Sequence, residues 1–483
     1  MSVIKNLEPK MVWKHFDDIR KIPRCSKHED KIREYIVNFA KKHNLEYKTD
    51  KTGNVVISKP GTKGMEKKPT VILQGHMDMV CEKNSDIEFD FSKDPIQLKL
   101  KGDILTANGT TLGADNGMGL AMSLAIIEDN NLKHGPLEAL FTIDEETGLT
   151  GAFAMESDML TGHIMLNLDS EDFGVITVGC AGGGDSQIKL PIKTQPINGS
   201  LTSLTVKVSG LRGGHSGVDV HEQRGNAVKL LTRILWKAKK DYNLYITEIK
   251  GGDKHNAIPR EAYANISVEK QDKDRFVTTL KDEGKNILQE YKPIDPNFKV
   301  DFQDIGKPKT TLTNDSQNRL LDLLHGLPHG IDKMSYDIPD LVETSTNLAK
   351  VTINKNNAAI NMSTRSSIKS ALQNLRDRIR AIAELSGAKV EEDKPYPGWK
   401  PNLESKLLKL SKKIFKDMYK QEPKVEAIHA GLECGIIGEK FPGMDMISIG
   451  PTIKYPHSPE EQVQISTVDK TYKYVLKILE NIQ

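Results

Sequence analysis

Residues 71–80 end an apolar run with a histidine and an aspartate two positions apart, in the order Gly-His76-Met-Asp78. On an extended strand, side chains two positions apart point to the same side. His76 and Asp78 can therefore face one point, with the carboxylate close to the imidazole. A metal-bound histidine commonly has a carboxylate or a carbonyl near its other ring nitrogen. Taken alone, the pair is weak evidence, because most histidines on strands are ordinary core or surface residues.

Three acidic clusters and one histidine loop follow, each after an apolar or glycine-rich segment. They contain Asp115, the run 144–146 (Asp-Glu-Glu), Asp169, and His457 between two prolines. Any one acidic cluster is commonly a solvated loop between a strand and a helix. Four such segments at strand ends in a βα pattern favour a shared site, because ligand sites in open α/β sheets gather at the carboxyl ends of the strands.

The candidate ligands favour two metal ions over one. The set consists of His76, Asp115, Glu146, Asp169 and His457. It carries three negative charges and two neutral imidazoles, so two divalent ions leave one positive charge, which a bridging hydroxide would cancel. Mixed imidazole and carboxylate ligands suit zinc best, although cobalt or manganese would also be accepted. Ions about 3.5–4 Å apart can polarise a carbonyl together and lower the pKa of the water between them.

These segments together resemble the motifs of the cocatalytic metallopeptidase family that includes carnosinase, carboxypeptidase G and the aminoacylases. The resemblance covers essentially the whole chain and is strongest to members that cleave unblocked dipeptides, including Xaa-His. It implies that His76 and Asp169 bind one ion. Glu146 and His457 would bind the other ion, and Asp115 would bridge the two.

The resemblance also implies roles for residues that are not ligands. Asp78 would orient His76, and the peptide bond between Asp115 and Asn116 would be cis. Glu145 would be the general base, which takes a proton from the attacking water and passes it to the leaving amine. The predicted function is a metal-dependent dipeptidase, in which a metal-bound hydroxide attacks the peptide carbonyl of a small peptide substrate.

Substrate-contacting residues are predicted in the middle of the chain, again through the resemblance. His215, in the glycine-rich segment 209–217, matches the lid histidine that hydrogen-bonds the substrate carbonyl in the transition state. Asn256 lies in an Asn-x-Ile-Pro turn that helps to hold the substrate. Arg365 matches the strand arginine that binds the terminal carboxylate, and the planar guanidinium group is suited to that task.

The segment 427–435 differs from the loop that many relatives have at this place. Glu433 stands where they carry an aspartate, and Glu433 and His429 are taken as substrate-binding candidates. The hypothesis for Glu433 is that it meets the free α-amino group of the substrate, which would favour dipeptides over N-acylated amino acids. The alternative is that both residues make only structural hydrogen bonds.

The order of the motifs predicts an α/β catalytic domain that is interrupted by an insertion. Residues 1–186 and 398–483 would form the catalytic domain, with a mixed sheet flanked by helices as in zinc exopeptidases. Residues 187–397 would form an inserted α+β lid domain. After the proline-marked boundary, apolar residues at helical spacing predict a core helix over residues 403–419.

The lid domain is predicted to contain an internal duplication. Residues 264–269 (ANISVE) align with residues 360–365 (INMSTR), which places Glu269 where the second copy has its arginine. The alignment predicts two ferredoxin-like halves, 187–305 and 306–397, although so short a repeat could also arise by coincidence. In relatives with a single lid, a partner subunit supplies the histidine and the asparagine. A duplicated lid could supply them in cis, so a homodimer is possible but not required.

Composition argues against several other classes of protein. The chain has 483 residues, enough for two or three domains, and its net charge of +2 gives no indication of nucleic acid or membrane as a partner. No stretch approaches the roughly 20 apolar residues of a membrane span, and the N-terminal segment lacks an apolar signal core. The four cysteines are far apart without paired spacing, which predicts buried thiols in a reducing cytoplasm.

Two alternatives to a dipeptidase stay open at this point. Within the same chemistry, the chain could be an N-acyl amino acid deacylase or a carboxypeptidase. From a different class, it could be a non-catalytic relative that binds peptides or metal. The glutamate beside the ligand Glu146 speaks against the second alternative, because pure binding requires ligands but no base.

Overall fold

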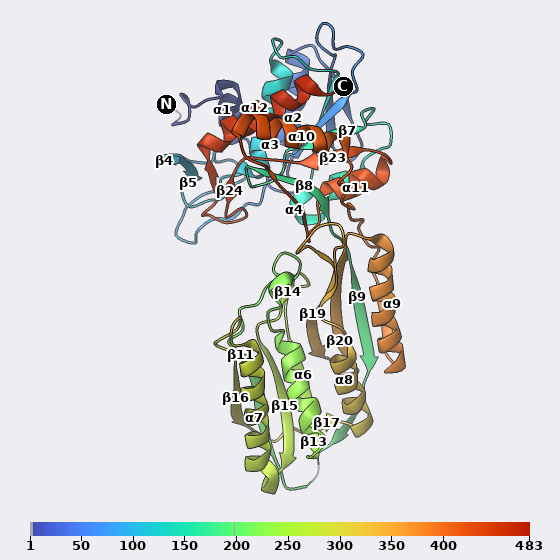
Figure 1. Cartoon of the computed structure of the whole chain (residues 1–483). Helices are drawn as coiled ribbons and strands as arrows, with labels where there is room; N and C mark the ends of the chain where they lie inside the picture. Colours follow the sequence, from blue (N-terminus) through green and yellow to red (C-terminus); the bar gives the residue numbers. More distant parts are fainter. Residues whose placement is uncertain (1–2, 198) are drawn as a thin grey trace. The chain divides into compact units, whose positions relative to one another are not determined.

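The computed structural model describes residues 3–197 and 199–483, which form two compact units (Figure 1). The first unit comprises the chain up to Gly179 with Trp399–Ala427 and Leu432–Gln483, and the second comprises Cys180–Gly398 and Ile428–Gly431. These divisions lie near the predicted boundaries at 186 and 397. The short segment that carries His429 departs from the prediction, because it groups with the second unit.

The first unit is built on an eight-stranded mixed sheet with the order β1-β2-β6-β3-β7-β23-β8-β22. Its central strands β6, β3, β7 and β23 run parallel to one another, so their carboxyl ends lie at the same edge. The strands are β1 Glu46–Thr49, β2 Val55–Lys59, β3 Val71–His76, β6 Leu137–Thr142, β7 Ile164–Asn167, β8 Val175–Cys180, β22 Lys424–Ile428 and β23 Asp445–Ser448.

A second, four-stranded sheet in this unit has the order β24-β25-β5-β4. Its strands are β4 Leu98–Lys101, β5 Ile104–Ala107, β24 Ile453–Lys454 and β25 Gln462–Gln464. The helices of the unit are α1 Lys10–Ile19, α2 Asp30–Lys42, α3 Ala114–Glu128, α4 Glu145–Gly148, α5 Thr150–Ala154, α10 Lys406–Tyr419, α11 Glu433–Lys440 and α12 Ile465–Asn481. Helix α3 packs on β3 and β6 and against α1 and α12, which lie beside it in Figure 1.

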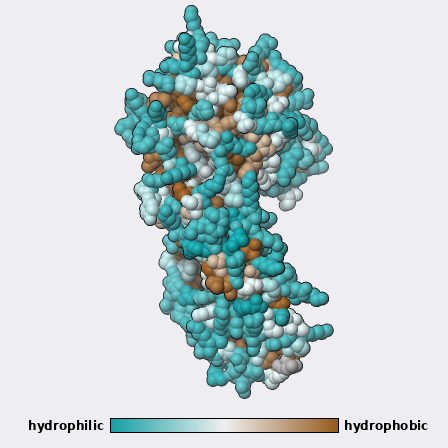
Figure 2. All heavy atoms as spheres, turned by 90° about the vertical axis from the view of Figure 1, so that its right-hand side faces the viewer, coloured by the Kyte–Doolittle hydropathy of each residue, from teal (hydrophilic) through white to brown (hydrophobic). Residues whose placement is uncertain are grey.

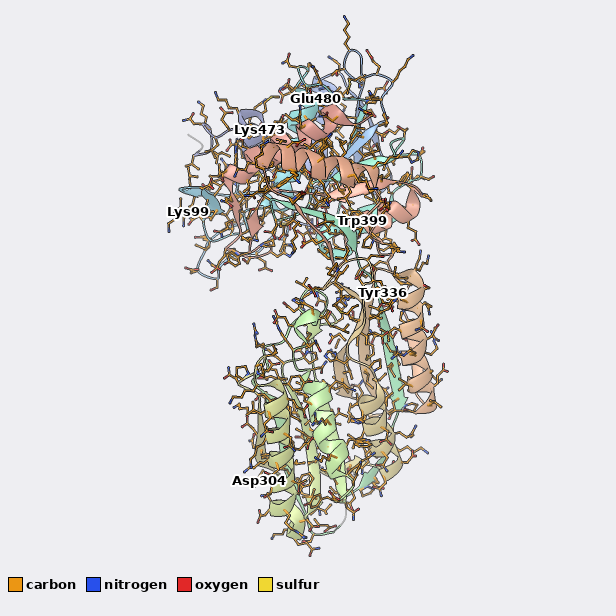
Figure 3. The ribbon with its side chains drawn as sticks, in the orientation of Figure 1. Lys99, Asp304, Tyr336, Trp399, Lys473 and Glu480 are labelled. Atoms are coloured by element: carbon orange, nitrogen blue, oxygen red, sulfur yellow. A yellow bond between two sulfur atoms is a disulfide. The ribbon has the colours of Figure 1, made fainter. Side chains whose placement is uncertain are left out.

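Helix α12 has one buried face and one exposed face. On α12, Val468, Val475 and Ile478 are buried. The face drawn in Figure 2 is mostly hydrophilic, with hydrophobic residues in small separate groups. Lys473 and Glu480 of α12 extend outward from the helix (Figure 3). Across the described residues, no helix is both long enough and apolar enough to cross a membrane.

The helix predicted over residues 403–419 begins three residues later than expected. Ser405 caps α10, because its hydroxyl accepts a hydrogen bond of 2.9 Å from the backbone N–H of Leu408. Leu403 therefore lies outside the helix, and it is 41% exposed. The prediction of a core helix is confirmed, since Leu408, Ile414 and Phe415 are buried.

The second unit is built on a nine-stranded sheet with the order β16-β11-β15-β13-β19-β20-β9-β21, and β18 pairs with β19. The strands of the unit are β9 Gly182–Pro191, β10 Thr194–Pro196, β11 Leu201–Ser209, β12 Gly214–His215, β13 Leu244–Gly251, β14 Ala257–Ile258, β15 Ala262–Glu269, β16 Lys299–Ile305, β17 Thr310–Leu312, β18 Gly330–Met334, β19 Val342–Ile353, β20 Asn357–Ser366 and β21 Lys389–Glu392. Helices α6 Ala227–Ala238, α7 Lys273–Tyr291, α8 Asn314–Gly326 and α9 Lys369–Leu385 pack on it, and η1 Val220–Glu222 and η2 Lys270–Asp272 are short 3₁₀ turns.

Two halves with the same strand order make up this sheet. In one half the order is β13-β15-β11-β16, with helices α6 and α7, and in the other it is β19-β20-β9-β21, with helices α8 and α9. Each half is a βαββαβ unit of the ferredoxin type. The aligned segments 264–269 and 360–365 fall on β15 and β20, which hold the same place in their halves. We therefore propose that the unit arose by duplication.

The boundaries of the two halves differ from those predicted. Strand β9 precedes the first half in the chain but pairs with β20 and β21 of the second half. The half formed by residues 201–305 is therefore inserted into the other half. The prediction of two consecutive halves, 187–305 and 306–397, missed this because sequence similarity marked only one strand of each half.

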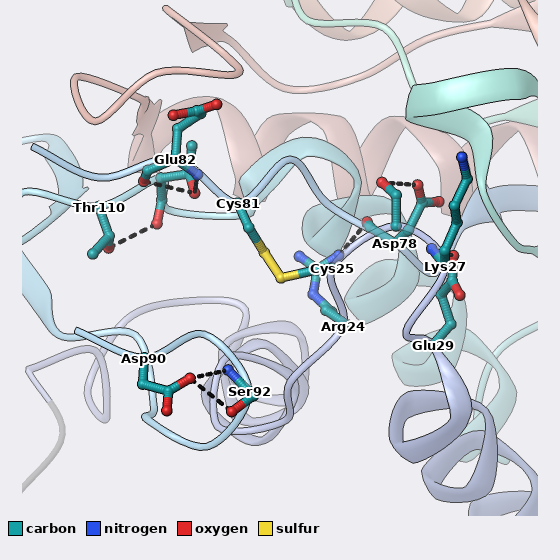
Figure 4. Close-up of a disulfide and its surroundings, with 12 residues drawn as sticks. Arg24, Cys25, Lys27, Glu29, Asp78, Cys81, Glu82, Asp90, Ser92 and Thr110 are labelled. Atoms are coloured by element: carbon teal, nitrogen blue, oxygen red, sulfur yellow. Dashed lines mark hydrogen bonds between the residues drawn. A yellow bond between two sulfur atoms is a disulfide. The ribbon is translucent and has the colours of Figure 1, made fainter.

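Cys25 and Cys81 form a disulfide (Figure 4), contrary to the expectation of unpaired cysteines. They are 56 positions apart, and their Cα atoms are 5.7 Å apart. Spacing did not reveal the pair because the fold brings the loop after α1 beside the loop after β3, where Cys25 and Met79 form a β-bridge. Cys180 and Cys434 are buried. The cysteines thus give no support for a reducing compartment.

Candidate metal centre

The predicted metal ligands lie at one edge of the main sheet of the first unit. His76 is the last residue of β3, Glu146 follows the end of β6, and Asp169 follows the end of β7. Asp115 lies in the first turn of α3, and His457 lies in the turn between β24 and β25. Parallel strands bring their carboxyl ends together, so His76, Glu146 and Asp169 meet there although they are far apart in the sequence.

The predicted ligands form two groups that share Asp115. In the first, His76 Nε2 lies 3.1 Å from Asp115 Oδ1 and 3.3 Å from Asp169 Oδ1. In the second, His457 Nε2 lies 3.2 Å from Asp115 Oδ2 and 2.9 Å from Glu146 Oε2. Within each group the candidate ligand atoms all lie within 4.8 Å of one another, close enough to hold a metal ion. The two oxygens of Asp115 thus face different groups.

The donor chemistry of both groups fits a divalent cation. Each group offers one imidazole and two carboxylates, which is a ligand set that zinc accepts. Glu146 Oε1 is buried and has no hydrogen-bond partner among the residues that the structure describes. A buried oxygen without a donor calls for a partner of another kind, and a cation would be one. The peptide bond between Asp115 and Asn116 is cis, as predicted.

Burial and the crowding of carboxylates shift the pKa values in this centre. Burial raises the pKa of Glu145 well above its usual range, and the neighbouring carboxylates of Asp169 and Glu146 raise it further, against the effect of His76. Hydrogen bonds to Asp115 and Glu146 raise the pKa of His457 to about 11. The centre therefore attracts positive charge, which bound divalent ions would supply.

Asp78 connects His76 to the turn that carries the two glutamates. Its Oδ1 lies 3.2 Å from His76 Nδ1 and accepts a hydrogen bond of 3.1 Å from the backbone N–H of Glu145. Its Oδ2 accepts hydrogen bonds from Ser26 Oγ at 2.7 Å and from the N–H of Glu146 at 3.3 Å. Although burial opposes ionisation, the interaction with His76 holds the pKa of Asp78 at about 2. These contacts suit the predicted orienting role.

Glu433 is buried in the first unit, with 1% of its surface exposed. Its Oε2 accepts hydrogen bonds from Gln74 Nε2 at 2.6 Å and from Thr142 Oγ1 at 2.7 Å. Its Oε1 has no hydrogen-bond partner in the described part of the chain. Burial raises the pKa of Glu433 to about 7. The prediction missed Gln74, yet a signal was present, because Gln74 precedes His76 by two positions and so faces the same side of β3.

His215 and Asn256 lie on adjoining loops of the second unit. Strands β12 and β14 pair His215 with Ala257, and the N–H of Ser216 donates to the Asn256 carbonyl oxygen at 2.8 Å. His215 Nδ1 accepts hydrogen bonds from the N–H groups of Gly217 at 3.2 Å and Val218 at 3.0 Å. Nε2 therefore carries the ring proton. Burial, with the charge of Arg365, lowers the pKa of His215 to about 4, so the ring is neutral at pH 7.

Arg365 and His429 belong to the same unit. Arg365 donates from Nη1 to the Tyr396 hydroxyl oxygen at 3.0 Å, and its Nε is buried without an acceptor in the described residues. His429 Nε2 lies 2.7 Å from Ser345 Oγ. Burial, with the charge of Arg365, lowers the pKa of His429 to about 3. The structure thus places His429 with Arg365 in the second unit and Glu433 in the first.

Known proteins resemble this chain over its whole length. Residues 72–481 match the family model described as Peptidase family M20/M25/M40. The cytosol non-specific dipeptidase of Escherichia coli (strain K12) is 39% identical over 485 residues, which cover 100% of this chain and 99% of that protein. The crystal structure of aminoacylhistidine dipeptidase from Vibrio alginolyticus is 40% identical, with a TM-score of 0.93 over 100% of this chain and 98% of that one.

More distant structures share the fold. The crystal structure of aminopeptidase PepT from Bacillus cereus ATCC 10987 has a TM-score of 0.56 at 16% identity, and the match covers 99% of each chain. At that identity the similarity concerns the fold alone. The matches over the full length, taken with the family model, lead to one conclusion: this chain belongs to Peptidase family M20/M25/M40.

Proposed function

We propose that this protein is a metal-dependent dipeptidase that hydrolyses unblocked dipeptides, including Xaa-His. The observation that carries the proposal is the pair of ligand groups that share Asp115, with Glu145 beside them. The names of the two relatives at 39% and 40% identity, a cytosol non-specific dipeptidase and an aminoacylhistidine dipeptidase, support the substrate class.

Two divalent ions are the proposed cofactors, and the imidazole and carboxylate ligands favour zinc over cobalt or manganese. His76 and Asp169 would hold one ion, Glu146 and His457 would hold the other, and Asp115 would contact both. When bound, the ions would act as Lewis acids toward the scissile carbonyl and would lower the pKa of a water between them.

The other site residues have proposed roles in positioning and proton transfer. Glu145 would accept the proton of the attacking water and donate it to the leaving amine nitrogen, and Asp78 would hold the ring of His76 in place. The neutral ring of His215 would donate its Nε2 proton to the substrate carbonyl oxygen. Asn256 would help to hold the substrate, and Arg365 would bind its terminal carboxylate.

The experiment that tests this function combines metal analysis with a substrate panel of free dipeptides, their N-acetyl forms, N-acetyl amino acids and tripeptides. We expect two ions per chain, rapid hydrolysis of free dipeptides such as Ala-His, complete loss of activity after removal of metal by a chelator, and recovery on addition of zinc. Faster cleavage of N-acetyl amino acids would favour the deacylase, and faster cleavage of tripeptides would favour the carboxypeptidase. Bound metal without any turnover would favour the non-catalytic relative.

Replacing Glu433 by glutamine tests the proposed contact with the substrate amino group. The unpartnered Oε1 is the atom available for an ammonium group, and a hydrogen bond between charged groups contributes about 1.5–3 kcal/mol. We expect kcat/KM for Ala-His to fall by roughly 10–100-fold, while N-acetyl amino acids change by less than about threefold. The exposed Glu439 on the same helix provides the control E439Q. Equal losses of kcat/KM for both substrate classes would rule out the contact with the amino group and would leave Glu433 with a structural role only.

The proposal extends to the localisation and the oligomeric state. We propose a cytoplasmic enzyme because of the cytosolic name of the Escherichia coli relative. The three proposed substrate-binding residues His215, Asn256 and Arg365 all belong to the second unit of one chain. A monomer would then be sufficient for substrate binding, although a homodimer is compatible with the proposal. Small peptides are the proposed partners, and neither nucleic acid nor a membrane is.

A further inference from the structure

Glu461 closes the turn that leads to the shared ligand Asp115. The carboxylate is 2% exposed and accepts hydrogen bonds from four consecutive backbone N–H groups. Oε2 accepts from Leu112 at 2.7 Å and Gly113 at 2.9 Å, and Oε1 accepts from Ala114 at 2.7 Å and Asp115 at 3.2 Å. Helix α3 begins at Ala114, so these donors have no partner within the helix. A negative charge at a helix N-terminus is favourable.

Arg24 holds the other side of the same turn. It is 2% exposed, and it donates from Nη1 to the carbonyl oxygens of Met77 at 3.1 Å and Asp78 at 2.5 Å (Figure 4). Its Nη2 donates to the carbonyl oxygen of Gly113. Gly113 has φ +70°, and a Cβ atom there would lie 2.6 Å from Arg24 Nη2. Glycine thus permits both the backbone conformation and the close approach of the guanidinium.

The two residues together connect three segments that carry ligands. Arg24 joins the loop after His76 to the turn before Asp115. Glu461 joins that turn to the hairpin of His457, because it lies four positions after His457 and directly before β25. None of these contacts needs a metal ion. The charge of Glu461 also interacts favourably with the buried guanidinium group of Arg24. A buried charge that loses its counter-charge is strongly destabilising.

We propose that Glu461 and Arg24 are positioning residues that hold Asp115 and His457 in metal-binding geometry before any ion binds. The proposal rests on the metal centre described under the proposed function. Neither residue stands out in the sequence, because their partners are backbone atoms, which leave no pattern of side-chain types. The only signal was the spacing of Glu461 from His457.

The test is the variant E461Q, with E460Q as its matched control. Glutamine offers one acceptor oxygen and turns an NH₂ group toward two of the four N–H donors. Glu460 suits the control because it is the neighbouring glutamate and is exposed. Metal-free proteins are titrated with zinc in competition with a chromophoric chelator, and the absorption spectrum of bound cobalt reports the ligand geometry. Replacing groups that orient ligands costs about 10–100-fold in metal affinity. We expect such a loss and an altered cobalt spectrum in E461Q, and wild-type values in E460Q.

The outcomes separate this inference from the function on which it rests. A wild-type protein that binds no metal would overturn the proposed function. A wild-type protein with two ions, together with an E461Q protein of unchanged affinity and spectrum, would overturn only the positioning role. If E461Q does not fold, E461D and R24K take its place. Both keep the charge, but aspartate is one methylene shorter than glutamate, and lysine has one ammonium group in place of the forked guanidinium group. Weaker zinc binding in these folded variants supports the inference, and unchanged binding contradicts it.

Discussion

Replacing Glu145 by glutamine is expected to lower kcat for dipeptide hydrolysis by about 10²–10⁴-fold, the usual contribution of a general base. The amide has the same shape as the carboxylate but cannot accept the proton of the attacking water. Glu145 belongs to neither of the two groups that share Asp115. Two ions should therefore stay bound, which elemental analysis of the variant would measure beside kcat.

The control for this prediction is E156Q, at a glutamate that pairs with the exposed Lys51. It should keep both the metal and the activity of the wild-type protein. If E145Q with its full metal content turned over within a few-fold of wild type, Glu145 would not be the base. Loss of metal in E145Q would mean instead that Glu145 is a ligand, which its position in a group with His76 and Glu146 also allows geometrically.

Replacing Asp115 by alanine is expected to weaken the binding of both ions by more than about 100-fold, since removing a ligand costs more than removing a group that orients one. The expectation follows from geometry: Asp115 Oδ1 lies 3.1 Å from His76 and Oδ2 lies 3.2 Å from His457. One substitution would therefore remove a donor from each group. Zinc titration of the metal-free variant would measure the effect, and activity at micromolar zinc should disappear.

Asp129, at the other end of helix α3, provides the control D129A. Its carboxylate accepts a hydrogen bond of 2.8 Å from the N–H of Asn131, far along the helix from the ligand groups. D129A should bind two ions as wild type does. A D115A protein that retained one ion at full affinity would show that Asp115 serves a single ion rather than both.

The ligand set could be predicted because each member follows an apolar strand or a glycine-rich turn. The rule that parallel strands share an edge places His76, Glu146 and Asp169 together, whereas Asp115 on α3 and His457 between β24 and β25 were grouped with them by their motifs and by the resemblance. The cis bond at Asp115 and the type of fold also followed from the resemblance. What stayed hidden depends on three-dimensional contact: the Cys25–Cys81 pair, and the backbone contacts of Arg24 and Glu461.

The ferredoxin type of the second unit could be predicted, but the order in which the chain connects its strands could not. The alignment of 264–269 with 360–365 identified equivalent strands, because alternating burial on a sheet preserves a pattern of residue types. It gave no information on β9, whose partners are far away in the sequence. The start of α10 was likewise misjudged, because the N-cap Ser405, rather than the spacing of apolar residues, sets where the helix begins.

The placement of residues 201–305 inside the other half has a consequence for the order of folding during synthesis. Of the strands in the second unit, β9 leaves the ribosome first, yet its neighbours β20 and β21 are made only after the whole inserted half. The inserted half has all four of its strands in one continuous stretch, so it can fold as soon as it emerges. Strand β9 must wait with an open edge until the last of the unit appears, and pairing over so long a separation is slow.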